Sequence, residues 1–566
     1  MTRAVLAAVA ALGVSLSGCA GAAVGGAPGA PAAGVGGASL RREDRVVVST
    51  YDEVLGVAAS RRLVFVLAPR GLGIYDRTFD AWRPPLAAGA DLPQGRPTAL
   101  AADPTSDAVW VGGVGSVTYY QPLTDYATRS SVPGVVDLIA FDRGNPGDAY
   151  VRASGQWSRV SSTGFVTPLG PGQLPLASAL EIPETLRDIA REFPSLESFA
   201  PLLTRDAQLR SWPVSAAAKS PDRASELWLG TLGNGLYRVD PSFNQSRHLP
   251  FGLLDPGAGA LALAADGVWV AALGEGVGGG ARGGLTFASD DLQRWRWLEP
   301  PRSTPLVGAR AYDLDVRGDV AWIATDRGLA RVATRSGGGD AGEVGDFVVL
   351  TAIDGLPSDA ALAVAARPGG AWVGTPRGVV YVADQASDGR RGARPRVGPV
   401  LASGAAVRAL LATGDTLWVG SDFGLLLVPP GDSARVVRAT AQGSDARLGR
   451  RIVALAASDT EVAVATPDAV LRIHRPTGRA LPPIEGAALA SLGGIRALAM
   501  DARTLWAAGP RGVVVLRRAG GAPRFLAVPG DLPAEAFDVA LGSDYAWVAT
   551  RDGVVRLRRL RDGSVP

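Results

Sequence analysis

The chain has 566 residues, which is too long for one ordinary globular core, so we expect several domains or a repeat array. Its formal net charge is only +3, and it has no long basic run of the kind that indicates nucleic-acid binding. Lys219 is the only lysine, so arginine carries nearly all the positive charge.

Residues 1–18 are predicted to be a signal peptide. Arg3 is followed by the apolar run 4–16, which is too short to span a bilayer and is typical of a secretory signal. Residues 16–19, Leu-Ser-Gly-Cys, resemble the lipobox of bacterial lipoproteins. In that family the chain is cut before the cysteine, which is then acylated. The resemblance implies lipidation at Cys19, the only cysteine of the chain; the alternative is an ordinary signal followed by a chance cysteine.

Residues 19–44 are predicted to be the lipidated cysteine and a flexible tether, because Ala, Gly and Pro dominate positions 20–39. Residue 20 is Ala and not Asp, which by the sorting rule of enteric lipoproteins implies the outer membrane. The expected location is therefore the cell envelope, with the protein held by its lipid at the periplasmic face or the cell surface. Several acyl chains anchor a protein durably.

A short strand pair recurs along almost the whole chain. Its best copy is residues 227–240, where an aromatic strand, a glycine turn and a second strand follow one another. The copies lie mostly about 40–50 residues apart, the length of a four-stranded propeller blade. Each copy is marked by one position, which is aromatic in all copies except Ala463: Phe65, Trp110, Tyr150, Trp228, Trp269, Trp322, Trp372, Trp418, Ala463, Trp506 and Trp547.

The repeat predicts an all-β fold, a β-propeller of about eleven four-stranded blades over residues 45–566. Period-two apolar runs bounded by Gly, Pro and Asp form short antiparallel strands, and radial packing of the sheets buries both of their faces. A large aromatic side chain between blades contributes on the order of 2–3 kcal/mol. The glycines after it lie where a turn often needs positive φ: Gly71, Gly328, Gly378, Gly424, Gly512 and Gly553.

The unit resembles the two-component-regulator propeller repeats of periplasmic sensor regions in bacterial hybrid kinases. The best matches are residues 227–240 and the connector-like Asp354-Gly-Leu-Pro-Ser358, with looser echoes at 90–93 and 530–533. The resemblance covers roughly residues 45–560 and implies the propeller fold. This sequence shows neither a kinase region nor a transmembrane helix, so the resemblance implies no direct signalling.

The last repeat lacks a fourth strand, whereas residues 45–49, Arg-Val-Val-Val-Ser, form a spare strand before the first repeat. We expect this strand to complete the last blade and so remove an open edge. Eleven blades exceed the usual 4–8 of one ring. Two rings, divided near residues 300–311, and one oversized ring both remain possible: usual ring sizes favour two, and the joined ends favour one.

Two segments interrupt the repeat. Residues 273–284 are glycine-rich and are expected to form a flexible excursion. Residues 176–211 replace a connector between blades and have a helical pattern, in which Leu186, Ile189, Ala190 and Phe193 share one face and Pro194 ends the helix. A second short helix is expected from Ser195 to Leu202. The helical insert either caps a channel or acts as a lid or docking element.

The turns after the second strands and the starts of the inner strands should emerge at one end of the blades, together with the helical insert. This predicts a charged binding face, made of Arg70, Arg327, Arg377 and Arg511 before the turn glycines and of Asp137, Asp313, Arg408, Arg496 and Asp538 on the inner strands. Arginine forks suit carboxylates, phosphates and acidic protein surfaces. The alternative is a set of solvated turns whose Asp and Arg side chains pair locally.

No catalytic or metal-binding constellation is visible. The two histidines, His248 and His474, have no partner at metal-ligand spacing, and residues 313–319 match a calcium loop only superficially. We therefore predict no cofactor and no metal. The expected function is non-enzymatic binding of a protein, a small anionic ligand or a glycan. The alternatives are a propeller enzyme of the hydrolase or lyase type and an outer-membrane assembly scaffold, resembling in outline the propeller lipoprotein of the β-barrel assembly machine.

Overall fold

The structure is a computed structural model that describes residues 40–144, 147–170, 172–176, 178–194, 196, 204–206, 209–243, 245–274, 282–301, 303–334, 343–344, 347–385, 394–402, 404–429, 437–438 and 446–566. The predicted signal peptide, Cys19, residues 20–39 of the tether and most of the second predicted helix lie outside these residues. Residues 40–44, which the sequence assigns to the tether, are folded. Leu40 packs against a buried cluster, and Asp44 in the 3-10 turn η1 (Arg42–Asp44) is buried beside Arg558.

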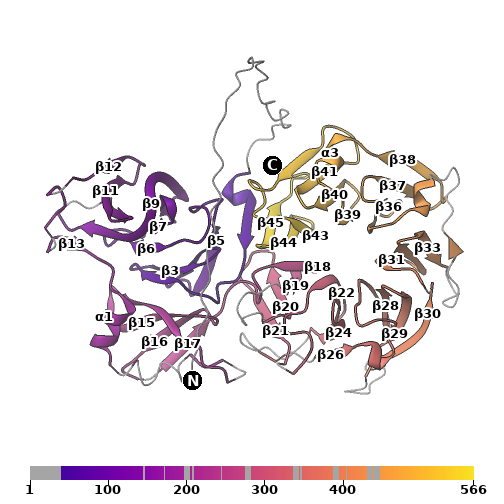
Figure 1. The fold of residues 1–566 in the computed structure, drawn as a ribbon, viewed down its shortest axis with the longest axis horizontal. Coiled ribbons are helices and arrows are strands. Elements are labelled where there is room, and N and C mark those ends of the chain that lie inside the picture. The colour runs from indigo at the N-terminus through magenta and orange to yellow at the C-terminus, as the bar shows by residue number, and fades with distance from the viewer. Residues whose placement is uncertain are drawn as a thin grey trace, which may run out of the picture. The chain divides into compact units, whose positions relative to one another are not determined.

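Seven sheets follow one another in a circle (Figure 1). Their inner strands contact in the order β18, β22, β27, β31, β35, β39 and β43, and β43 contacts β18 again. We call this set the seven-sheet ring. Its sheets are β18 (Ala258–Ala264), β19 (Gly267–Ala272), β20 (Leu285–Ser289), β21 (Trp295–Glu299) with β25 (Glu343–Val344); β22 (Ala311–Arg317), β23 (Val320–Thr325), β24 (Gly328–Ala333), β26 (Phe347–Leu350); β27 (Ala363–Arg367), β28 (Gly370–Thr375), β29 (Gly378–Ala383), β30 (Arg396–Leu401); β31 (Val407–Thr413), β32 (Thr416–Ser421), β33 (Gly424–Val428), β34 (Val437–Arg438); β35 (Ala454–Ala457), β36 (Glu461–Ala465), β37 (Val470–His474), β38 (Ala480–Ile484); β39 (Ala497–Met500), β40 (Thr504–Gly509), β41 (Gly512–Arg517), β42 (Arg524–Ala527); and β43 (Ala536–Leu541), β44 (Tyr545–Thr550), β45 (Gly553–Arg558), β1 (Arg45–Val48).

The last sheet of the ring is completed by the N-terminal strand, as the spare strand predicts. β1 pairs antiparallel with β45, and Val48 lies opposite Val554. A Cβ atom on Gly553, whose φ is 118°, would lie 2.3 Å from the carbonyl oxygen of Val48. The first and last parts of the described chain therefore hold one blade together.

Four more blade-like sheets, which we call the four-sheet group, lie between β1 and β18 in the sequence; two of them are the halves of one eight-stranded sheet that divides at β9. Their inner strands contact in the order β14, β2, β6 and β9. The long β9 is shared, because its first half is the outer strand of one sheet and its second half the inner strand of the next. The strands are β2 (Gly56–Ala59), β3 (Leu63–Ala68), β4 (Gly71–Asp76), β5 (Ala81–Ala87); β6 (Ala99–Ala102), β7 (Val109–Gly112), β8 (Val114–Gln121), β9 (Tyr126–Asp142), β10 (Asp148–Ala153), β11 (Gln156–Ser161), β12 (Val166–Pro168); and β14 (Val214–Ser220), β15 (Arg223–Thr231), β16 (Leu236–Asp240), β17 (Gln245–Leu249).

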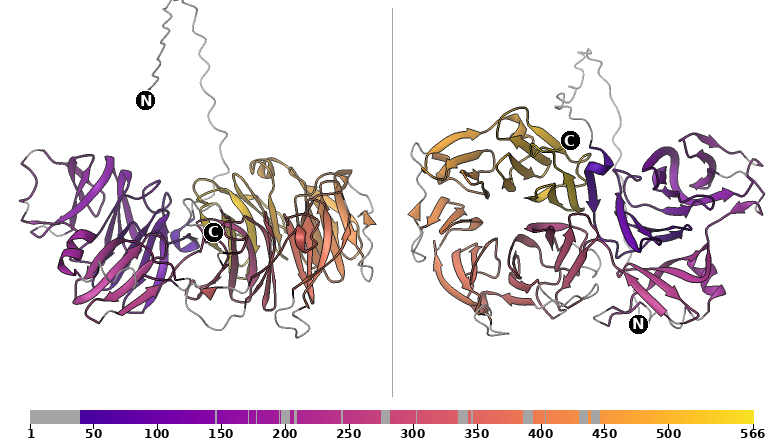
Figure 2. Two further views of the ribbon diagram at one scale, coloured as in Figure 1. Left: turned by 60° about the horizontal axis from the view of Figure 1, so that its bottom comes forward. Right: turned by 180° about the vertical axis from the view of Figure 1, so that it is seen from behind.

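The chain thus enters the seven-sheet ring with β1, builds four sheets, and returns to the ring at β18. Residues 300–311, where we expected a division between rings, instead connect β21 to β22, whose sheets are neighbours within the ring. The chain passes between the two sets of sheets at residues 49–55 and 250–257. The same course of the chain between the two sets of sheets is seen from behind in the right-hand view of Figure 2.

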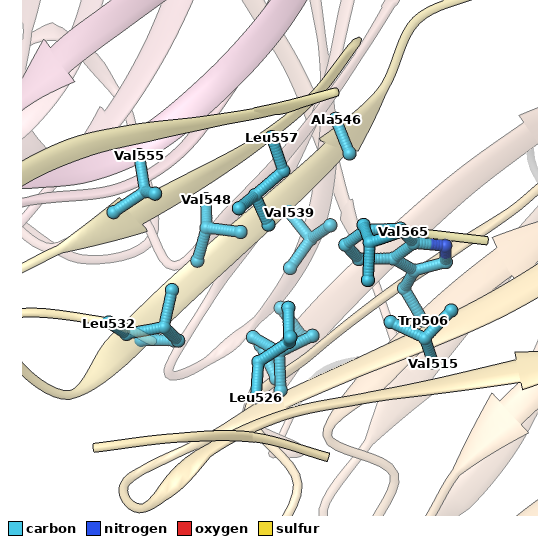
Figure 3. Packing of buried hydrophobic residues seen from close by; sticks show 14 of the residues in the cluster. Trp506, Val515, Leu526, Leu532, Val539, Ala546, Val548, Val555, Leu557 and Val565 are labelled. Atoms are coloured by element: carbon cyan, nitrogen blue, oxygen red, sulfur yellow. The ribbon is translucent and has the colours of Figure 1, made fainter. Parts of the chain in front are cut away.

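The repeated aromatic residues fill the spaces between sheets. Nine of the ten are buried, and Trp418 is partly buried. Figure 3 shows the buried cluster around Trp506, in which Val515 and Leu526 of one sheet pack together with Val539 and Val548 of the next. These aromatic side chains hold blades together and are not exposed to a ligand.

The turn glycines confirm the prediction at five of six positions. Gly328, Gly378, Gly424, Gly512 and Gly553 have φ between 111° and 152°. Gly71 does not, and close packing explains the glycine there: a Cβ atom would lie 2.4 Å from the carbonyl oxygen of Leu86.

The helical insert forms α1 (Leu186–Glu192), as the pattern predicts. Thr185 caps the helix in a capping box with Asp188, and Ile189 is fully buried. The helix packs on β14 and on buried residues of β15 and β16, while β13 (Leu180–Glu181) pairs with the end of β9. The described part of the insert therefore lies against the end of β9 through β13 and against the β14 sheet through α1.

Three short elements complete the described chain. They are the 3-10 turns η2 (Ala352–Asp354) and η4 (Ala446–Gly449), and the one-turn helix α3 (Ala487–Ala490). All three lie in connectors between sheets of the ring.

Candidate functional site

The inner strands of the seven-sheet ring begin at one end of the ring, beside the turns that join second and third strands. We call this end the rim. β22, β31 and β43 each carry a β-bulge at their start, where the pairing register skips Tyr312, Arg408 and Phe537. A bulge re-aims a side chain and is frequent near functional sites. The bulges therefore place these three side chains at the rim and out of the strand pairing.

Phe537 is surrounded by arginines. The guanidinium carbons of Arg496, Arg310 and Arg551 lie 5.0, 5.2 and 5.9 Å from the centre of its ring. Glu535 pairs with Arg496 at 2.7 Å and accepts a hydrogen bond from Arg551 Nε at 2.8 Å. Contacts of this kind contribute about 0.5–2 kcal/mol each and hold the guanidinium planes in place.

Arg310 also lies 5.7 Å from the ring centre of Tyr312, whose side chain is 43% exposed. Arg310 and Tyr312 belong to the β22 sheet and Phe537 to the β43 sheet, which lie on either side of β18. The residue of β18 at the same position is Gly259, where a Cβ atom would lie 2.5 Å from the carbonyl oxygen of Ala311. Since Gly259 has no side chain, Arg310 reaches across β18 to Phe537.

We call Tyr312, Phe537, Arg310, Arg496 and Arg551, with Glu535, the Phe537 cluster. Tyr, Phe and Arg are enriched in the buried centres of protein interfaces. Their backbone positions are fixed by strands, and the arginines are held by stacking and by Glu535. The cluster can present aromatic surface and guanidinium donors to a partner with little loss of side-chain freedom.

The residues of the predicted charged face come from both sets of sheets. Arg70 and Asp137 belong to the four-sheet group, and the other seven predicted residues belong to the seven-sheet ring. Arg70 forms an ion pair with Asp552, Asp137 accepts three hydrogen bonds from Arg152, and Arg408 binds Asp422 at 2.7 Å. Asp137 and Arg408 thus pair locally within their own sheets. The Arg70–Asp552 pair instead joins the four-sheet group to the turn of the seven-sheet ring that carries Arg551.

The other three predicted turn arginines lie at the rim of the ring. Arg327 donates to the carbonyl oxygen of Val307 at 3.0 Å, and Arg377 to that of Pro357 at 3.4 Å. Arg511 is exposed and lies against Gly493 in the connector that leads to β39. These arginines support the connectors, and none of them contacts Phe537 in the described interactions.

Asp313 and Asp538 bind the backbone and do not face a partner at the rim. Asp313 Oδ2 accepts the N–H of Val364 at 2.8 Å, and Asp538 Oδ2 accepts the N–H of Leu261 at 2.8 Å. Each carboxylate thereby links its own inner strand to the next one. Burial among the inner strands raises the pKa of Asp313 to about 8, with a smaller contribution from Asp538, and raises the pKa of Asp538 to about 6.

This shift predicts a pH dependence of stability. The folded state binds the Asp313 proton more tightly than the unfolded chain, so this contribution is fully present below about pH 4 and is lost as pH rises through about 8. Asp313→Asn should abolish the part of the loss between about pH 6 and 8, whereas Asp538, whose pKa is raised to about 6, keeps its own contribution at lower pH. Because Asp313 keeps some contact with solvent, we expect the variant to gain about 1–2 kcal/mol relative to wild type between pH 5 and 9.

The measurement is chemical unfolding of both proteins at pH 5, 7 and 9. Asp415→Asn, at an exposed turn carboxylate, is the matched control and should follow the wild type. An Asp313→Asn profile parallel to that of the wild type would show that the carboxyl group is not held protonated.

The aromatic part of the rim was not predicted from the sequence. Tyr312 and Phe537 occupy the same repeat position as the predicted residues Arg408 and Arg496, whereas the predicted residues Asp313 and Asp538 are one residue further along. Aligning the starts of the inner strands would have found them. The pairing of Arg310 with Phe537 across β18 has no sequence signal, because it depends on the order of the sheets in space.

Neither histidine belongs to a site. His248 Nε2 contacts the carbonyl oxygen of Asn234 at 2.7 Å, and His474 Nδ1 contacts Thr477 Oγ1 at 2.8 Å. Within the described ranges, no group of three or more His, Cys, Asp or Glu side chains is arranged to hold a metal ion. None of the helices in the described part of the chain is long and apolar enough to cross a membrane.

No protein-family model matches the chain, and no curated protein matches its sequence. Similar solved structures include the extracellular domain of a putative hybrid two component system from B. thetaiotaomicron, at 13% identity and a TM-score of 0.41, with 89% of this chain and 70% of that chain covered. PorZ, a surface component of the type-IX secretion system of Porphyromonas gingivalis, is 13% identical with a TM-score of 0.42, over 92% and 73% of the two chains.

YCF48, solved with a D1 peptide, is 14% identical with a TM-score of 0.39, over 54% of this chain and 94% of that chain. The predicted all-β fold of four-stranded antiparallel sheets is confirmed by the strand pairing and by the circular order of the sheets in this chain itself. Because the identities and TM-scores are this low, the functions of the similar structures are not assigned to this chain.

Proposed function

We propose that the protein is a non-enzymatic binding protein of the cell envelope, held by a lipid on Cys19, that binds a protein partner at the rim of its seven-sheet ring. The observation that carries this proposal is the Phe537 cluster. Three arginines converge on one aromatic ring, and an exposed Tyr312 lies beside them. The lipobox-like residues 16–19 support the envelope location.

The chemistry of the cluster favours a protein partner over a small ligand. A small-molecule site is concave and encloses most of its ligand. Aromatic and arginine side chains at an open rim are instead typical of the residues that dominate protein–protein affinity. The partner should carry carboxylates or carbonyl oxygens that accept from Arg310 and Arg496, and an apolar group that packs on Tyr312.

The test is recovery of the partner from native envelopes by tagged wild type and by the Tyr312→Ala/Phe537→Ala variant. Truncation of a hot-spot residue costs about 2 kcal/mol or more, so recovery should fall at least ~10-fold. The matched control is Phe243→Ala, which removes a 73% exposed aromatic between β16 and β17 of the four-sheet group. Equal recovery of every co-purifying protein by all three would refute binding at the rim.

A further inference from the structure

The four-sheet group contains a cavity of about 480 Å³ at the end where its inner strands finish. Residues at the ends of all four inner strands line it, and its apolar wall includes Val57, Ala102, Phe141 and Ala218. The volume falls within the range of small-molecule sites. This cavity is separate from the Phe537 cluster, which belongs to the seven-sheet ring.

The helical insert supplies the fifth side of the cavity. Glu181 pairs with Phe141 at the end of β9, and the following residues to Glu184 line the cavity between β9 and β14. Lys219 of β14 binds Glu184 at 2.8 Å and Glu192 of α1 at 2.6 Å. These ion pairs raise the pKa of Lys219 and fix the insert to the β14 sheet.

Charges of opposite sign alternate around the mouth of the cavity. In the order of the sheets they are Arg61, then Asp103 and Asp107, then Arg143, then the insert carboxylates, then Lys219. The insert side is internally paired, since Arg143 lies 3.6 Å from Glu181 and Lys219 binds Glu184. A multiply charged anion or cation would meet like charges around half of such a mouth.

The opposite side keeps unfilled hydrogen-bonding capacity. Asp103 is only 7% exposed, and its Oδ1 accepts both the N–H and the hydroxyl of Thr105 at 2.8 Å. Asp107 Oδ1 accepts from Ser60 Oγ at 2.7 Å. Among the described residues, the Oδ2 atoms of both aspartates and the guanidinium of Arg61 have no hydrogen-bond or ion-pair partner.

From this arrangement we propose that the cavity binds a small zwitterion of the amino-acid or short-peptide class. The ligand ammonium would bind Asp103 and Asp107, its carboxylate would bind Arg61, and its apolar side chain would pack on Val57 and Phe141. Charge-assisted hydrogen bonds of this type are about twice as strong as neutral ones. The Oδ2 atom of the nearly buried Asp103 carboxylate gains a partner that the described residues do not supply.

The experiment is titration calorimetry of the intact mature protein with the dipeptide Leu-Leu, its N-acetyl form and its C-terminal amide. Leu-Leu should bind at one site, and N-acetylation should weaken binding at least ~10-fold. Arg61→Ala should weaken Leu-Leu at least ~5-fold and leave the amide unchanged, because only the free carboxylate reaches Arg61. Asp103→Asn and Asp107→Asn should weaken the binding of both ligands that have a free ammonium group, Leu-Leu and its C-terminal amide.

The matched control is Arg503→Ala, an exposed turn arginine of the seven-sheet ring, which should bind Leu-Leu like the wild type. The guanidinium of Arg61 has no partner among the described residues, and Arg61→Ala keeps the backbone oxygen that accepts from Arg77, so this variant should fold normally. It therefore tests the proposal even if Asp103→Asn disturbs its turn. Absence of Leu-Leu binding at millimolar concentration would overturn the proposal. So would binding that tolerates both N-acetylation and Arg61→Ala. Neither result would bear on the rim.

Discussion

A protein that begins at Thr50 is expected to lose the cooperative unfolding of the seven-sheet ring. This truncation removes β1, whose Val46, Val47 and Val48 are buried against β45 and its neighbours. Burying one valine contributes about 1.5–3 kcal/mol, so the strand contributes roughly 5–8 kcal/mol. Natural proteins are stable by only about 5–15 kcal/mol. The truncation also leaves the edge of β45 unpaired and prone to aggregation.

The point variant Val48→Asp tests the same claim with the chain length kept. It places a carboxylate at a fully buried position opposite Val554, and we expect a loss of at least ~3 kcal/mol in urea unfolding. Val114→Asp, at a side chain that is 60% exposed in the four-sheet group, is the control and should change stability little. If Val48→Asp unfolds at the wild-type urea concentration, β1 does not close the ring.

The second large effect is expected at Arg282, which is buried where the two sets of sheets meet. Its guanidinium binds Asp52 Oδ2 at 2.8 Å and Glu299 Oε2 at 3.0 Å, and Arg210 of the insert binds Glu299 at 2.8 Å. Burial raises the pKa of Asp52 even with Arg282 beside it. Arg282→Ala leaves buried carboxylates without their cation, which costs about 3–5 kcal/mol.

The sign of the pH effect follows from the same carboxylates. Without Arg282, the buried carboxyl groups of Asp52 and Glu299 have no cation to stabilise their charged forms, and their charged forms are more populated at pH 8 than at pH 5. The loss of stability should therefore be larger at pH 8 than at pH 5. Arg294→Ala is the control, because Arg294 pairs with Asp266 at 2.6 Å and both side chains are more than half exposed. Exposed pairs contribute about 0–1 kcal/mol. Similar urea midpoints for both variants would contradict a structural role of Arg282.

The sequence predicted the parts of the fold that repeat. The spacing of the aromatics predicted the sheets, and the spare strand 45–49 predicted the partner of β45, because both depend on local pattern and strand count. The division between the two sets of sheets could not be predicted. The connector at 300–311 is rich in proline but joins neighbouring sheets, and the passages at 49–55 and 250–257 have no distinct composition.

The candidate site was predicted only in part, for a similar reason. Arg496 was selected as a rim residue and lies in the Phe537 cluster, but Asp137 was grouped with it although Asp137 belongs to the four-sheet group. Which sheets are neighbours depends on tertiary packing. The β-bulge at the start of β22 places Tyr312 at the rim and turns Asp313 toward the neighbouring inner strand. Such a bulge depends on backbone geometry, which cannot be predicted from one sequence.

The burial of Arg282 could not be predicted from the composition of its segment. It lies at the end of the glycine-rich stretch 273–284, which was predicted to be a flexible excursion, yet its side chain is only 7% exposed. Its partner Asp52 is 230 residues away in the sequence, and its partner Glu299 is 17 residues away. A single arginine within glycines carries no signal of burial, since burial is set by the sheets that close over it.

The most direct test of binding at the rim is photo-crosslinking in cells. A photoreactive phenylalanine at Tyr312, beside Phe537, should form one adduct with a partner protein. The same residue at Phe243, which is more exposed at 73% but lies in the four-sheet group, should form none. An adduct at Tyr312 that disappears with Phe537→Ala is the predicted result. The same adduct at both positions, or one at Phe243 alone, would contradict the assignment of the rim as the binding surface.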